Sequence, residues 1–429
     1  MREMKDSGVA WIGEIPKDWD LSRLKFSSTY NDESIKEDTN PEKEIEYVEI
    51  GSVTLENGVE KAEVMRFKDA PSRARRIARK GDIIISTVRT YLKAIALIEK
   101  DSYTVSTGFC VIRPQKCMDS GYLKYFCSSE LFTSEVSACS VGISYPAINA
   151  STLMDFHIIN PPLAVQHKIV RVLDEKCNHV DSLIANVQAQ IEKLKAYKQS
   201  LITEVVTKGL DPNAPMKDSE LPWFGLIPQH WKLAKIKMYA TTCSGGTPPS
   251  GDMSYYNGKI NWVCSYDLCE KEIEETEKTL SDKGAEHIAG TLQLPNSILV
   301  AMYGGAGTIG NSGLLKCYAR TNQAICSIHF DEAVVEPKFA FYQTMFIRRY
   351  WMFFAVGTRK DPNISQDIVR NMKYVIPPIQ EQTAIATYLD AKCSQIDQLI
   401  TLKESKIEKL QQYKRSLIYE YVTGKKEVV

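Results

Sequence analysis

The feature that most constrains the fold of this chain is an internal repeat. The motif DSGVAWIGEIPKDW, which begins at Asp6, returns 212 positions later as DSELPWFGLIPQHW, which begins at Asp218. A longer segment, residues 161–207, returns 216 positions later as residues 377–423. Because the two shifts nearly agree, the sequence predicts two copies of one unit, each a globular part followed by a long helix.

The helical part of each copy carries an apolar seam whose steps alternate between four and three residues, which is the spacing of a coiled coil. Over roughly 40 residues such a helix is about 60 Å long. Each helix alone would expose its stripe, so we expect the two to cover each other as an antiparallel pair. The seam positions are Val180, Ile184, Val187, Ile191, Leu194, Leu201 and Val205, and then Ile396, Ile400, Ile407, Leu410, Leu417 and Tyr421.

A lysine interrupts this seam at the same place in both copies, as Lys198 and Lys414. One interpretation is that each lysine lays its aliphatic stem along the apolar face and keeps its ammonium group in water. The other is that the two lysines fix the register between the helices, as single polar residues do in coiled-coil seams.

The globular parts contain turn signals followed by short apolar runs, such as KGDIIISTVR and NSILVAMYGG, which predict buried strands. We therefore expect fold class α/β (α+β), with two globular domains of mixed sheet and helix, separated by two long helices that form an antiparallel coiled coil, and an internal pseudo-twofold repeat. The predicted domains are residues 1–160 (first globular domain), 161–210 (central long helix), 211–217 (linker), 218–376 (second globular domain) and 377–429 (C-terminal long helix).

Charge and cysteine content narrow the class of protein. The 53 basic and 53 acidic residues balance, which argues against coating nucleic acid through bulk charge and leaves local basic faces open. Eleven cysteines without C-x-x-C pairs or a histidine cluster predict reduced thiols in a cytoplasmic protein and no metal site. The sequence shows neither a signal-peptide core nor a membrane span of about 20 apolar residues.

Two segments resemble catalytic motifs and are interpreted otherwise. The stretch NPPL at Asn160 approaches the Asn-Pro-Pro-aromatic motif of adenine methyltransferases, but Leu163 cannot stack on a flipped base. Its counterpart IPPI has also lost the asparagine, so the shared Pro-Pro pair predicts the start of a helix. The loop GAGTIGNS has Asn311 where a phosphate-binding loop needs lysine. Elsewhere in the sequence, no catalytic set of a nucleophile, a base and an orienting acid can be assembled. We therefore expect no catalytic residues.

Candidate binding residues concentrate in the loops of the globular parts. Residues 65–93 are rich in arginine and lysine; such a run is often a solvated face, but residues that follow a buried strand can also grip phosphates and reach base edges. The second copy offers aromatic and small polar residues at matching places, while its acidic segment 269–278 predicts a solvated helix or a protein contact. The expected DNA contacts are Arg73, Arg75, Arg76, Arg89, Tyr91 and Lys93 in the first copy, and Ser244, Gly245, Gly246, Thr247, Tyr255, Tyr256, Tyr303, Gly304, Asn322, Arg359 and Lys360 in the second.

Over essentially its full length, the chain resembles the specificity subunits of type I restriction-modification systems. The matching motifs are WIGEIPKDW with WFGLIPQHW, KGDIIISTVR, SGGTP, TNQAI, and the two Pro-Pro starts of long helices. The resemblance implies that each globular part is a target-recognition domain for one half of an asymmetric, interrupted sequence in double-stranded DNA. It also implies that the helices set the spacing between the halves.

The same resemblance implies the partners and cofactors. The subunit would carry no catalysis and would bridge two methyltransferase subunits and, through them, the restriction subunits. S-adenosylmethionine, ATP and magnesium would then bind in those partners, with no cofactor in this chain. Two alternatives stay open at this point: an autonomous DNA methyltransferase or nuclease, and a coiled-coil adaptor that does not touch DNA.

Overall fold

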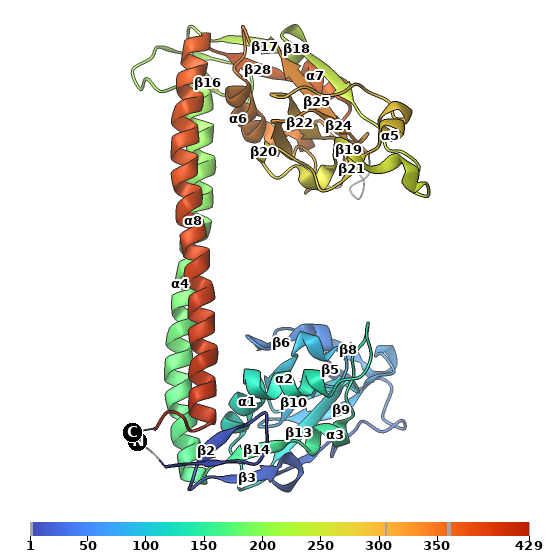
Figure 1. Cartoon of the computed structure of the whole chain (residues 1–429), viewed down its shortest axis with the longest axis vertical. Coiled ribbons are helices and arrows are strands. Elements are labelled where there is room, and N and C mark those ends of the chain that lie inside the picture. The colour runs from blue at the N-terminus through green and yellow to red at the C-terminus, as the bar shows by residue number, and fades with distance from the viewer. Residues whose placement is uncertain (1–2, 305–306, 358–361, 429) are drawn as a thin grey trace. The chain divides into compact units, whose positions relative to one another are not determined.

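The computed structural model describes residues 3–304, 307–357 and 362–428. The chain divides into two compact units (Figure 1). Unit 1 comprises residues 1–188 and 404–429, and unit 2 comprises residues 189–403. Each unit therefore contains one globular part and a stretch of both long helices.

The helices and strands are as follows. The first globular part contains β1 (Met4–Asp6), β2 (Glu14–Pro16), β3 (Asp20–Arg23), β4 (Ser28–Tyr30), β5 (Glu44–Val48), β6 (Val53–Thr54), β7 (Gly58–Val59), β8 (Glu63–Arg66), β9 (Ala74–Arg79), β10 (Ile83–Ser86), β11 (Ile95–Leu97), β12 (Ser102–Ser106), β13 (Phe109–Pro114), α1 (Ser120–Ser128), α2 (Glu130–Ala138), α3 (Ala150–Met154) and β14 (His157–Asn160). The long helix α4 (Leu163–Lys208) follows.

The second globular part contains β15 (Met216–Asp218), β16 (Leu226–Pro228), β17 (Lys232–Lys235), β18 (Ala240–Ser244), β19 (Tyr256–Val263), β20 (Lys271–Ile273), β21 (Thr279–Leu280), α5 (Asp282–His287), β22 (Ile298–Ala301), β23 (Ser312–Leu315), β24 (Ala319–Thr321), β25 (Ile325–Phe330), α6 (Pro337–Ile347), β26 (Val356–Gly357), β27 (Pro362–Asn363), α7 (Gln366–Asn371) and β28 (Lys373–Ile376). The long helix α8 (Ile379–Val422) ends the second copy.

The two globular parts share most of their strand order. In unit 1 a sheet of order β11-β10-β13-β4 lies beside a second sheet in which β5 and β12 run parallel. In unit 2 the order β23-β22-β25-β18 repeats the first sheet with β20 added, and β19 and β24 repeat the parallel pair. Four strands predicted from the sequence are thus found: β10, β13, β22 and β25. The prediction of two related domains of mixed sheet and helix is confirmed.

The acidic segment 269–278 is not a helix, so that interpretation of it is wrong, while the alternative of a protein contact stays a prediction. Its central residues form strand β20, which pairs in parallel with β23 at the edge of the sheet. Glu270 accepts a hydrogen bond from the guanidinium of Arg348 at 2.6 Å. Pairing with a neighbouring strand supplies backbone hydrogen bonds that a solvated acidic helix would have to make internally, so tertiary contacts override local propensity here.

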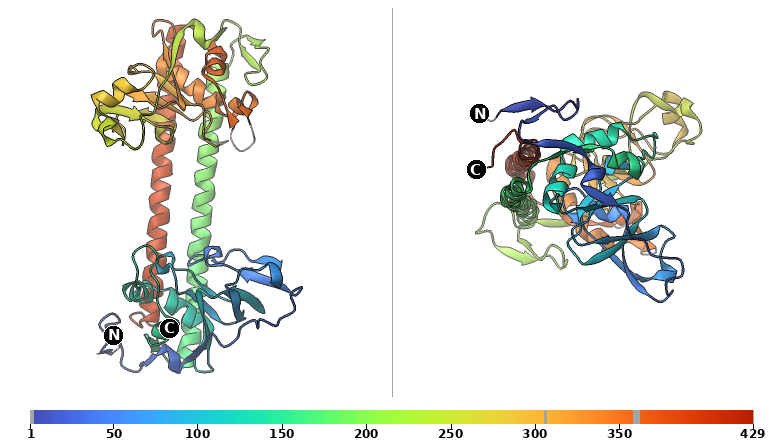
Figure 2. Two further views of the ribbon diagram at one scale, coloured as in Figure 1. Left: turned by 90° about the vertical axis from the view of Figure 1, so that its right-hand side faces the viewer. Right: turned by 90° about the horizontal axis from the view of Figure 1, so that it is seen from below.

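The long helices run antiparallel to each other within each unit (Figures 1 and 2). In unit 1 the seam residues Val180 and Val187 of α4 and Leu417 and Tyr421 of α8 are buried. In unit 2 the same holds for Ile191, Leu201 and Val205 of α4 and for Ile396 of α8. The predicted antiparallel coiled-coil pairing is therefore found, with the apolar seam as its buried face.

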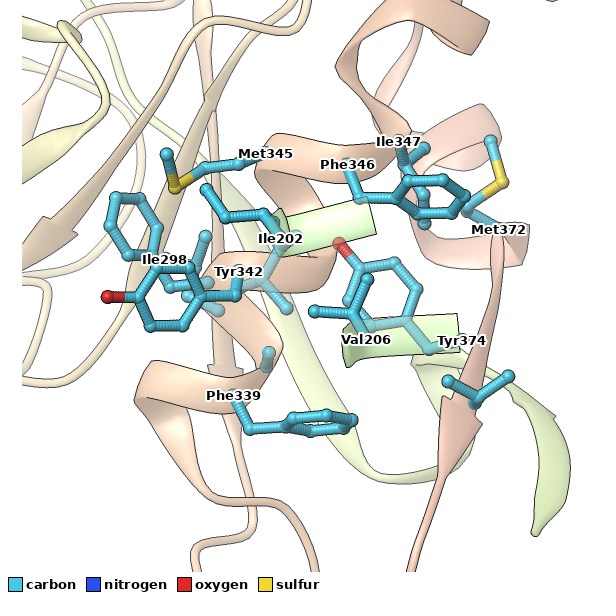
Figure 3. Close-up of a cluster of buried hydrophobic side chains, with 14 of the residues drawn as sticks. Ile202, Val206, Ile298, Phe339, Tyr342, Met345, Phe346, Ile347, Met372 and Tyr374 are labelled. Atoms are coloured by element: carbon cyan, nitrogen blue, oxygen red, sulfur yellow. The ribbon is translucent and has the colours of Figure 1, made fainter. Parts of the chain in front are cut away.

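Each globular part is fixed to the helices by an apolar core. In unit 2, Ile202 and Val206 of α4 pack with Phe339 and Phe346 of α6 and with Tyr374 of β28 (Figure 3). In unit 1 a second core joins α1 to Ile169 and Leu173 of α4 and to Leu417 of α8. Each Å² of apolar surface removed from water stabilises the fold by about 25 cal/mol, so these cores are the main attachment of each sheet to the helices.

A buried glutamine explains the Asn-Pro-Pro stretch at the start of α4. The side-chain amide of Gln166 donates to the carbonyl oxygens of Cys117 (3.2 Å) and Pro161 (2.8 Å) and to Oδ1 of Asn160 (3.1 Å). Its Oε1 accepts from the backbone N–H of Asp119 at 2.8 Å. The polar atoms that would hold a target base in a methyltransferase are therefore engaged within the chain.

The same contact is repeated at the start of α8. Gln382 donates to the carbonyls of Val334 (2.9 Å) and Pro377 (2.8 Å) and accepts from the backbone N–H of Glu336 at 2.9 Å. Both glutamines are fully buried. The prediction that the Pro-Pro pairs begin helices is confirmed, because α4 starts at Leu163 and α8 at Ile379.

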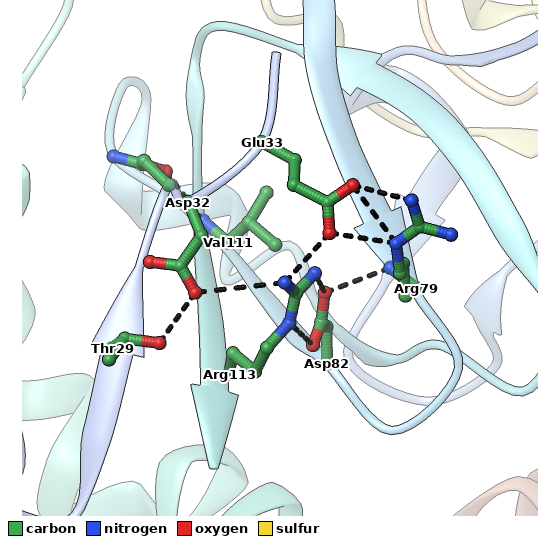
Figure 4. A network of polar contacts seen from close by, with 8 residues as sticks. Thr29, Asp32, Glu33, Arg79, Asp82, Val111 and Arg113 are labelled. Carbon is green, nitrogen blue, oxygen red and sulfur yellow. Dashed lines mark hydrogen bonds and ion pairs between the residues drawn. The ribbon is translucent and has the colours of Figure 1, made fainter. Parts of the chain in front are cut away.

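An ionic network joins the two sheets of unit 1 (Figure 4). Glu33 accepts from Arg79 (2.7 Å) and Arg113 (2.8 Å), and Arg113 also donates to both oxygens of the buried Asp82. The hydrogen bond from Arg79, with help from Arg113, lowers the pKa of Glu33 to about 2, although burial acts in the opposite direction. Arg79 ends β9, Asp82 precedes β10 and Arg113 lies in β13, so the network holds three strands in fixed relation.

Among the described residues, no helix is both long enough and apolar enough to cross a membrane. The same part of the chain holds no group of three or more His, Cys, Asp or Glu side chains that could bind a metal ion. The domain boundaries predicted from the sequence stay a prediction.

Candidate nucleic-acid interface

Several predicted contact residues of unit 1 meet at the ends of adjacent strands. The backbone N–H of Thr107 donates to the carbonyl of Arg73, and that of Thr87 to the carbonyl of Gly108, both at 2.8 Å. The chain then continues from Thr87 into the turn that contains Arg89. We call the region formed by Arg73, residues 87–93, residues 107–108 and the adjoining hairpin 139–147 the unit 1 edge.

Arg89 sits in an unusual backbone conformation at this edge. It caps a single 3-10 turn, Thr90–Leu92, and both Arg89 (φ 50°) and the closing Lys93 (φ 49°) are left-handed. This conformation costs a non-glycine residue roughly 1 kcal/mol or more, and such strain is concentrated at functional sites. The turn carries Arg89 and Tyr91 into solvent and leaves Lys93 half-buried.

Two of the other three predicted arginines of unit 1, Arg73 and Arg75, already have partners within the chain. Arg73 donates to the hydroxyl of Tyr47 at 3.2 Å and forms an ion pair with Glu49, contacts that raise its pKa. Arg75 lies over the ring of Phe67, 5.0 Å from its centroid.

Arg76 is only partly exposed. Its guanidinium is half-buried, and burial lowers its pKa. Nη1 of Arg76 has no hydrogen-bond partner among the described residues. The structure therefore brings Arg89, Tyr91, Lys93 and Arg73 to one edge, while Arg75 and Arg76 lie within β9.

Several basic residues between residues 65 and 93 form ion pairs with acidic residues. Arg66 and Lys68 both bind Glu42, at 2.9 and 2.6 Å, and Arg79 binds Glu33. These partners lie 24 to 46 positions away in the sequence. Arg89 differs from them, because it forms no ion pair within the described part of the chain.

Sequence reasoning missed the hairpin at residues 139–147. Val141 and Ala147 exchange backbone hydrogen bonds of 2.9 Å, and Ala147 also bridges to Val88. The guanidinium of Arg89 lies over the ring of Tyr145, 5.0 Å from its centroid. The repeat could have revealed this hairpin, because Val141-Gly142 matches Val356-Gly357 of the second copy, just before the segment TRKDPN.

Unit 2 forms an equivalent edge with different side chains. The backbone N–H of Gly246 donates to the carbonyl of Thr321 (3.0 Å), and that of Asn322 to the carbonyl of Val263 (3.0 Å). Thr247 forms a hydrogen bond with Gln323. A Cβ on Gly245 would lie 1.7 Å from the carbonyl oxygen of Thr321, so packing within the chain requires this glycine.

The remaining predicted residues of unit 2 lie in two groups. Tyr303 is exposed beside Gly304, and the adjacent Met302 accepts from the backbone N–H of Ile364 at 3.0 Å. That bond repeats the one from Ile148 to Thr87 in unit 1, so the two hairpins are anchored at equivalent strand ends.

The second group surrounds the η6 turn (Met253–Tyr255) of unit 2. Tyr255 lies 4.7 Å from the ring of His287, and the hydroxyl of Tyr256 donates to the carbonyl of Pro248 at 2.8 Å. Apart from this group, Ser244 lies at the end of β18, where its hydroxyl contacts Gln366 at 3.0 Å. Arg359 and Lys360 lie outside the described residues. Whether any of these side chains touches DNA stays a prediction.

The two seam lysines form matching ion pairs between the long helices. Lys198 of α4 lies 2.7 Å from the carboxylate of Asp397 on α8, within unit 2. Lys414 of α8 lies 2.7 Å from the carboxylate of Asp181 on α4, within unit 1. Both lysine side chains are largely covered, and both aspartates are about half exposed. The contacts suit the register interpretation, which stays a prediction.

The geometry of each edge suits recognition of a surface rather than catalysis of a reaction. In unit 1 a strained turn, a guanidinium without an ion pair among the described residues, exposed rings and a hairpin converge. Unit 2 keeps a hairpin and the exposed ring of Tyr303 and adds small polar groups. Guanidinium and amide groups pair with base edges, and loops on a rigid sheet can present them in a groove.

Comparison with known proteins identifies the family. The sequence matches the type I restriction modification DNA specificity domain twice, at residues 16–193 and 228–412. The MjaVIII type I restriction enzyme specificity subunit of Methanocaldococcus jannaschii is 26% identical over 333 residues, covering 75% of this chain and 73% of that protein. The EcoKI specificity subunit of Escherichia coli is 24% identical over 290 residues, covering 65% and 60%.

Solved structures agree in fold. A chain from a structure of a type I restriction-modification system is 22% identical, with a TM-score of 0.75 and coverage of 96% of this chain and 99% of that chain. The HsdS subunit of Thermoanaerobacter tengcongensis is 21% identical with a TM-score of 0.50, covering 96% and 98%. With both copies of the domain matched over most of its length, the chain belongs to the family of type I restriction-modification DNA specificity domains, as a specificity subunit that carries two of them.

Proposed function

We propose that each unit of this specificity subunit reads one half of a bipartite, asymmetric target in double-stranded DNA. The observation that supports this most is the pair of equivalent edges: the same strand ends anchor the same hairpin, but the exposed side chains differ. A shared scaffold places two readers in matching frames, and different side chains select different bases. The long helices would set the distance between the two half-sites.

We further propose that the chain is a non-catalytic member of its complex. It would recruit two methyltransferase subunits and, through them, the restriction subunits, which would hold S-adenosylmethionine, ATP and magnesium. No cofactor is assigned to this chain. We place the complex in the cytoplasm, a location with which the eleven free cysteines are compatible.

The duplication of the surface beside the helices supports the proposal of two equal partners. A cavity of about 700 Å³ in unit 2 and one of about 780 Å³ in unit 1 lie where the globular part meets both helices. A partner present in two copies would meet the same chemistry twice. The matching residues are Tyr342, Asp390, Cys393, Asp397 and Lys198 in unit 2, and Tyr125, Asp174, Cys177, Asp181 and Lys414 in unit 1.

Mapping of methylated adenines in cells with and without this chain tests the proposed function, combined with co-purification of a methyltransferase subunit. We expect loss of methylation at one bipartite, asymmetric motif. Unchanged methylation without a stable complex would contradict the proposal and favour the adaptor alternative.

A direct assay tests the non-catalytic role. The purified chain, incubated with DNA and labelled S-adenosylmethionine, or with DNA, ATP and magnesium, should neither methylate nor cleave the DNA. Turnover by the chain alone would instead make it an autonomous enzyme.

A further inference from the structure

The hairpin of the unit 1 edge exposes apolar side chains at its tip. Ile143 is 102% exposed, Val141 81% and Tyr145 66%, and the neighbouring turn adds Tyr91 and Leu92. Single exposed apolar residues are ordinary, but a group gathered on one projection marks a contact surface.

The backbone of this hairpin is held in place. Besides the paired bonds between Val141 and Ala147, the hydroxyl of Thr90 donates to that of Ser140 at 2.8 Å. Gly142 has a φ of +113°, and a Cβ there would lie 3.0 Å from the carbonyl oxygen of Tyr145. The tip is thus a built turn that presents Ile143 in a defined direction.

The charge beside the tip indicates a nucleic acid as its partner. Arg89 lies over the ring of Tyr145 without an ion-pair partner in the described residues, and Lys93 closes the same turn. A guanidinium resting on an aromatic face keeps its donors free for guanine or phosphate while losing conformational freedom.

The equivalent hairpin of unit 2, β26 with β27, carries no copy of these side chains. Val356 pairs with Asn363 as Val141 pairs with Ala147, and each hairpin leads to a buried isoleucine bound at the same strand end. The anchoring is kept while the sequence between the paired positions changes from GISYP to GTRKDP. Variation at the tip of a hairpin whose anchoring is kept is what two different half-sites require.

We propose that the hairpin 139–147 is a base-reading element of unit 1, in which Ile143 contacts the 5-methyl group of a thymine in the major groove and Tyr145 positions Arg89. The thymine methyl is the one apolar group on the major-groove edges of the base pairs, so it is the partner that an aliphatic side chain can select. This inference rests on the proposed function, since it assumes that unit 1 reads one half-site.

Replacement of thymine by deoxyuridine, which removes only the methyl group, tests the contact of Ile143. The subunit, assembled with its methyltransferase subunits, is titrated with duplexes that carry its mapped target, in which each thymine of the unit 1 half-site is replaced in turn on either strand. At one position the wild-type complex should bind about fourfold more weakly, the value expected for one buried methyl group. The Ile143→Ser complex should bind both duplexes equally.

Val64→Ser is the matched control, because Val64 lies on β8 of unit 1 and is 66% exposed. It should keep the full response to deoxyuridine. A wild-type complex that is insensitive at every thymine would overturn the proposal, as would an Ile143→Ser complex with an unchanged response. Loss of assembly by Ile143→Ser would also overturn it, because the hairpin would then be a protein contact.

The role of Tyr145 as a positioning residue has its own test. Tyr145→Phe keeps the ring beneath Arg89 and should retain the sequence preference of the wild type in selections from randomised duplexes. Tyr145→Ser should relax the preference at the base pair that Arg89→Ala also relaxes, and at no other. Equal behaviour of Phe and Ser variants would overturn this role. A wild-type complex that prefers no sequence would instead refute the proposed function itself.

Discussion

Lys198 donates to both carboxylate oxygens of Asp397, at 2.8 and 2.7 Å, across the pair of long helices. The repeat places Lys414 opposite Asp181 in the same way, with both distances 2.7 Å. A lysine within an apolar seam thus finds its counter-charge on the neighbouring helix, at one position in each unit.

A double-mutant cycle on Lys198 and Asp397 should show a favourable coupling of about 0.5 kcal/mol, typical of partly exposed ion pairs. The coupling should shrink at high salt because exposed charges are screened. Urea unfolding of the four proteins in the cycle measures the coupling. The same cycle on Lys195 and Glu192, an exposed pair within α4, is the control for an ion pair that does not join the two helices. If the coupling is zero and Lys198→Met is as stable as the wild type, the ion pair does not fix the helix register. Lys198 would then contribute only through its aliphatic stem.

Unit 1 should lose stability in acid through Glu33. In the folded state the pKa of Glu33 is lowered from 4.5 to about 2, chiefly by the hydrogen bond from Arg79. The ionised carboxylate therefore stabilises unit 1, and this contribution is fully present above pH 4.5. That contribution is lost as the pH falls from 4.5 towards 2, because the carboxylate takes up a proton.

Urea unfolding at a series of pH values measures this effect. The difference in stability between wild type and Glu33→Gln should shrink as the pH falls through this window and be constant above it. Glu37→Gln, at an exposed glutamate without an ion pair in the described residues, is the control. A difference that does not change with pH would show that the network does not stabilise the charged form.

Replacement of either buried glutamine, Gln166 or Gln382, by glutamate should lower the stability of its unit. Gln166→Glu removes the donor to the carbonyl of Pro161 and places a charge where no water reaches, so unit 1 should lose about 2 kcal/mol or more. Gln382→Glu should do the same in unit 2. Thermal unfolding compares them with Gln229→Glu on an exposed turn. Equal melting temperatures for all three variants would contradict this assignment.

Arg89 and Arg66 should differ in their importance for binding. Arg89→Ala should weaken specific DNA binding by about 1–3 kcal/mol if the guanidinium pairs with a base. Arg66→Ala should have a much smaller effect, because that guanidinium is already paired with Glu42. Fluorescence titration of a labelled target by the assembled complex measures both. Equal losses would indicate a general contribution of positive charge.

The repeat and the periodicity of the chain predicted much of the fold. Strands β10 and β22, the starts of α4 and α8 and the antiparallel seam follow from local patterns that recur in both copies. The strand formed by Lys271–Ile273 was not predictable, because its partner β23 lies about 40 residues away and an acidic run has no strand signal of its own.

The candidate interface was only partly visible in the sequence. Arg89 and Tyr91 were identified because they follow a buried strand. The neutralisation of Arg73 by Glu49 depends on the pairing of β5, β12 and β9, which a single sequence does not specify. The hairpin was missed because a short apolar stretch such as Val141–Ile143 is ordinarily a core signal, and only its place in the fold exposes it.

Methylation mapping with one substitution in each unit tests the central claim most directly. Arg89→Ala alters the unit 1 edge, and Tyr303→Ala alters the unit 2 edge. Each variant, expressed with the methyltransferase subunits, should broaden one half of the methylated motif and leave the other half and the spacing unchanged, and the two variants should affect opposite halves. Broadening of the same half by both variants, or of neither half by either, would contradict the account that each unit reads one half-site.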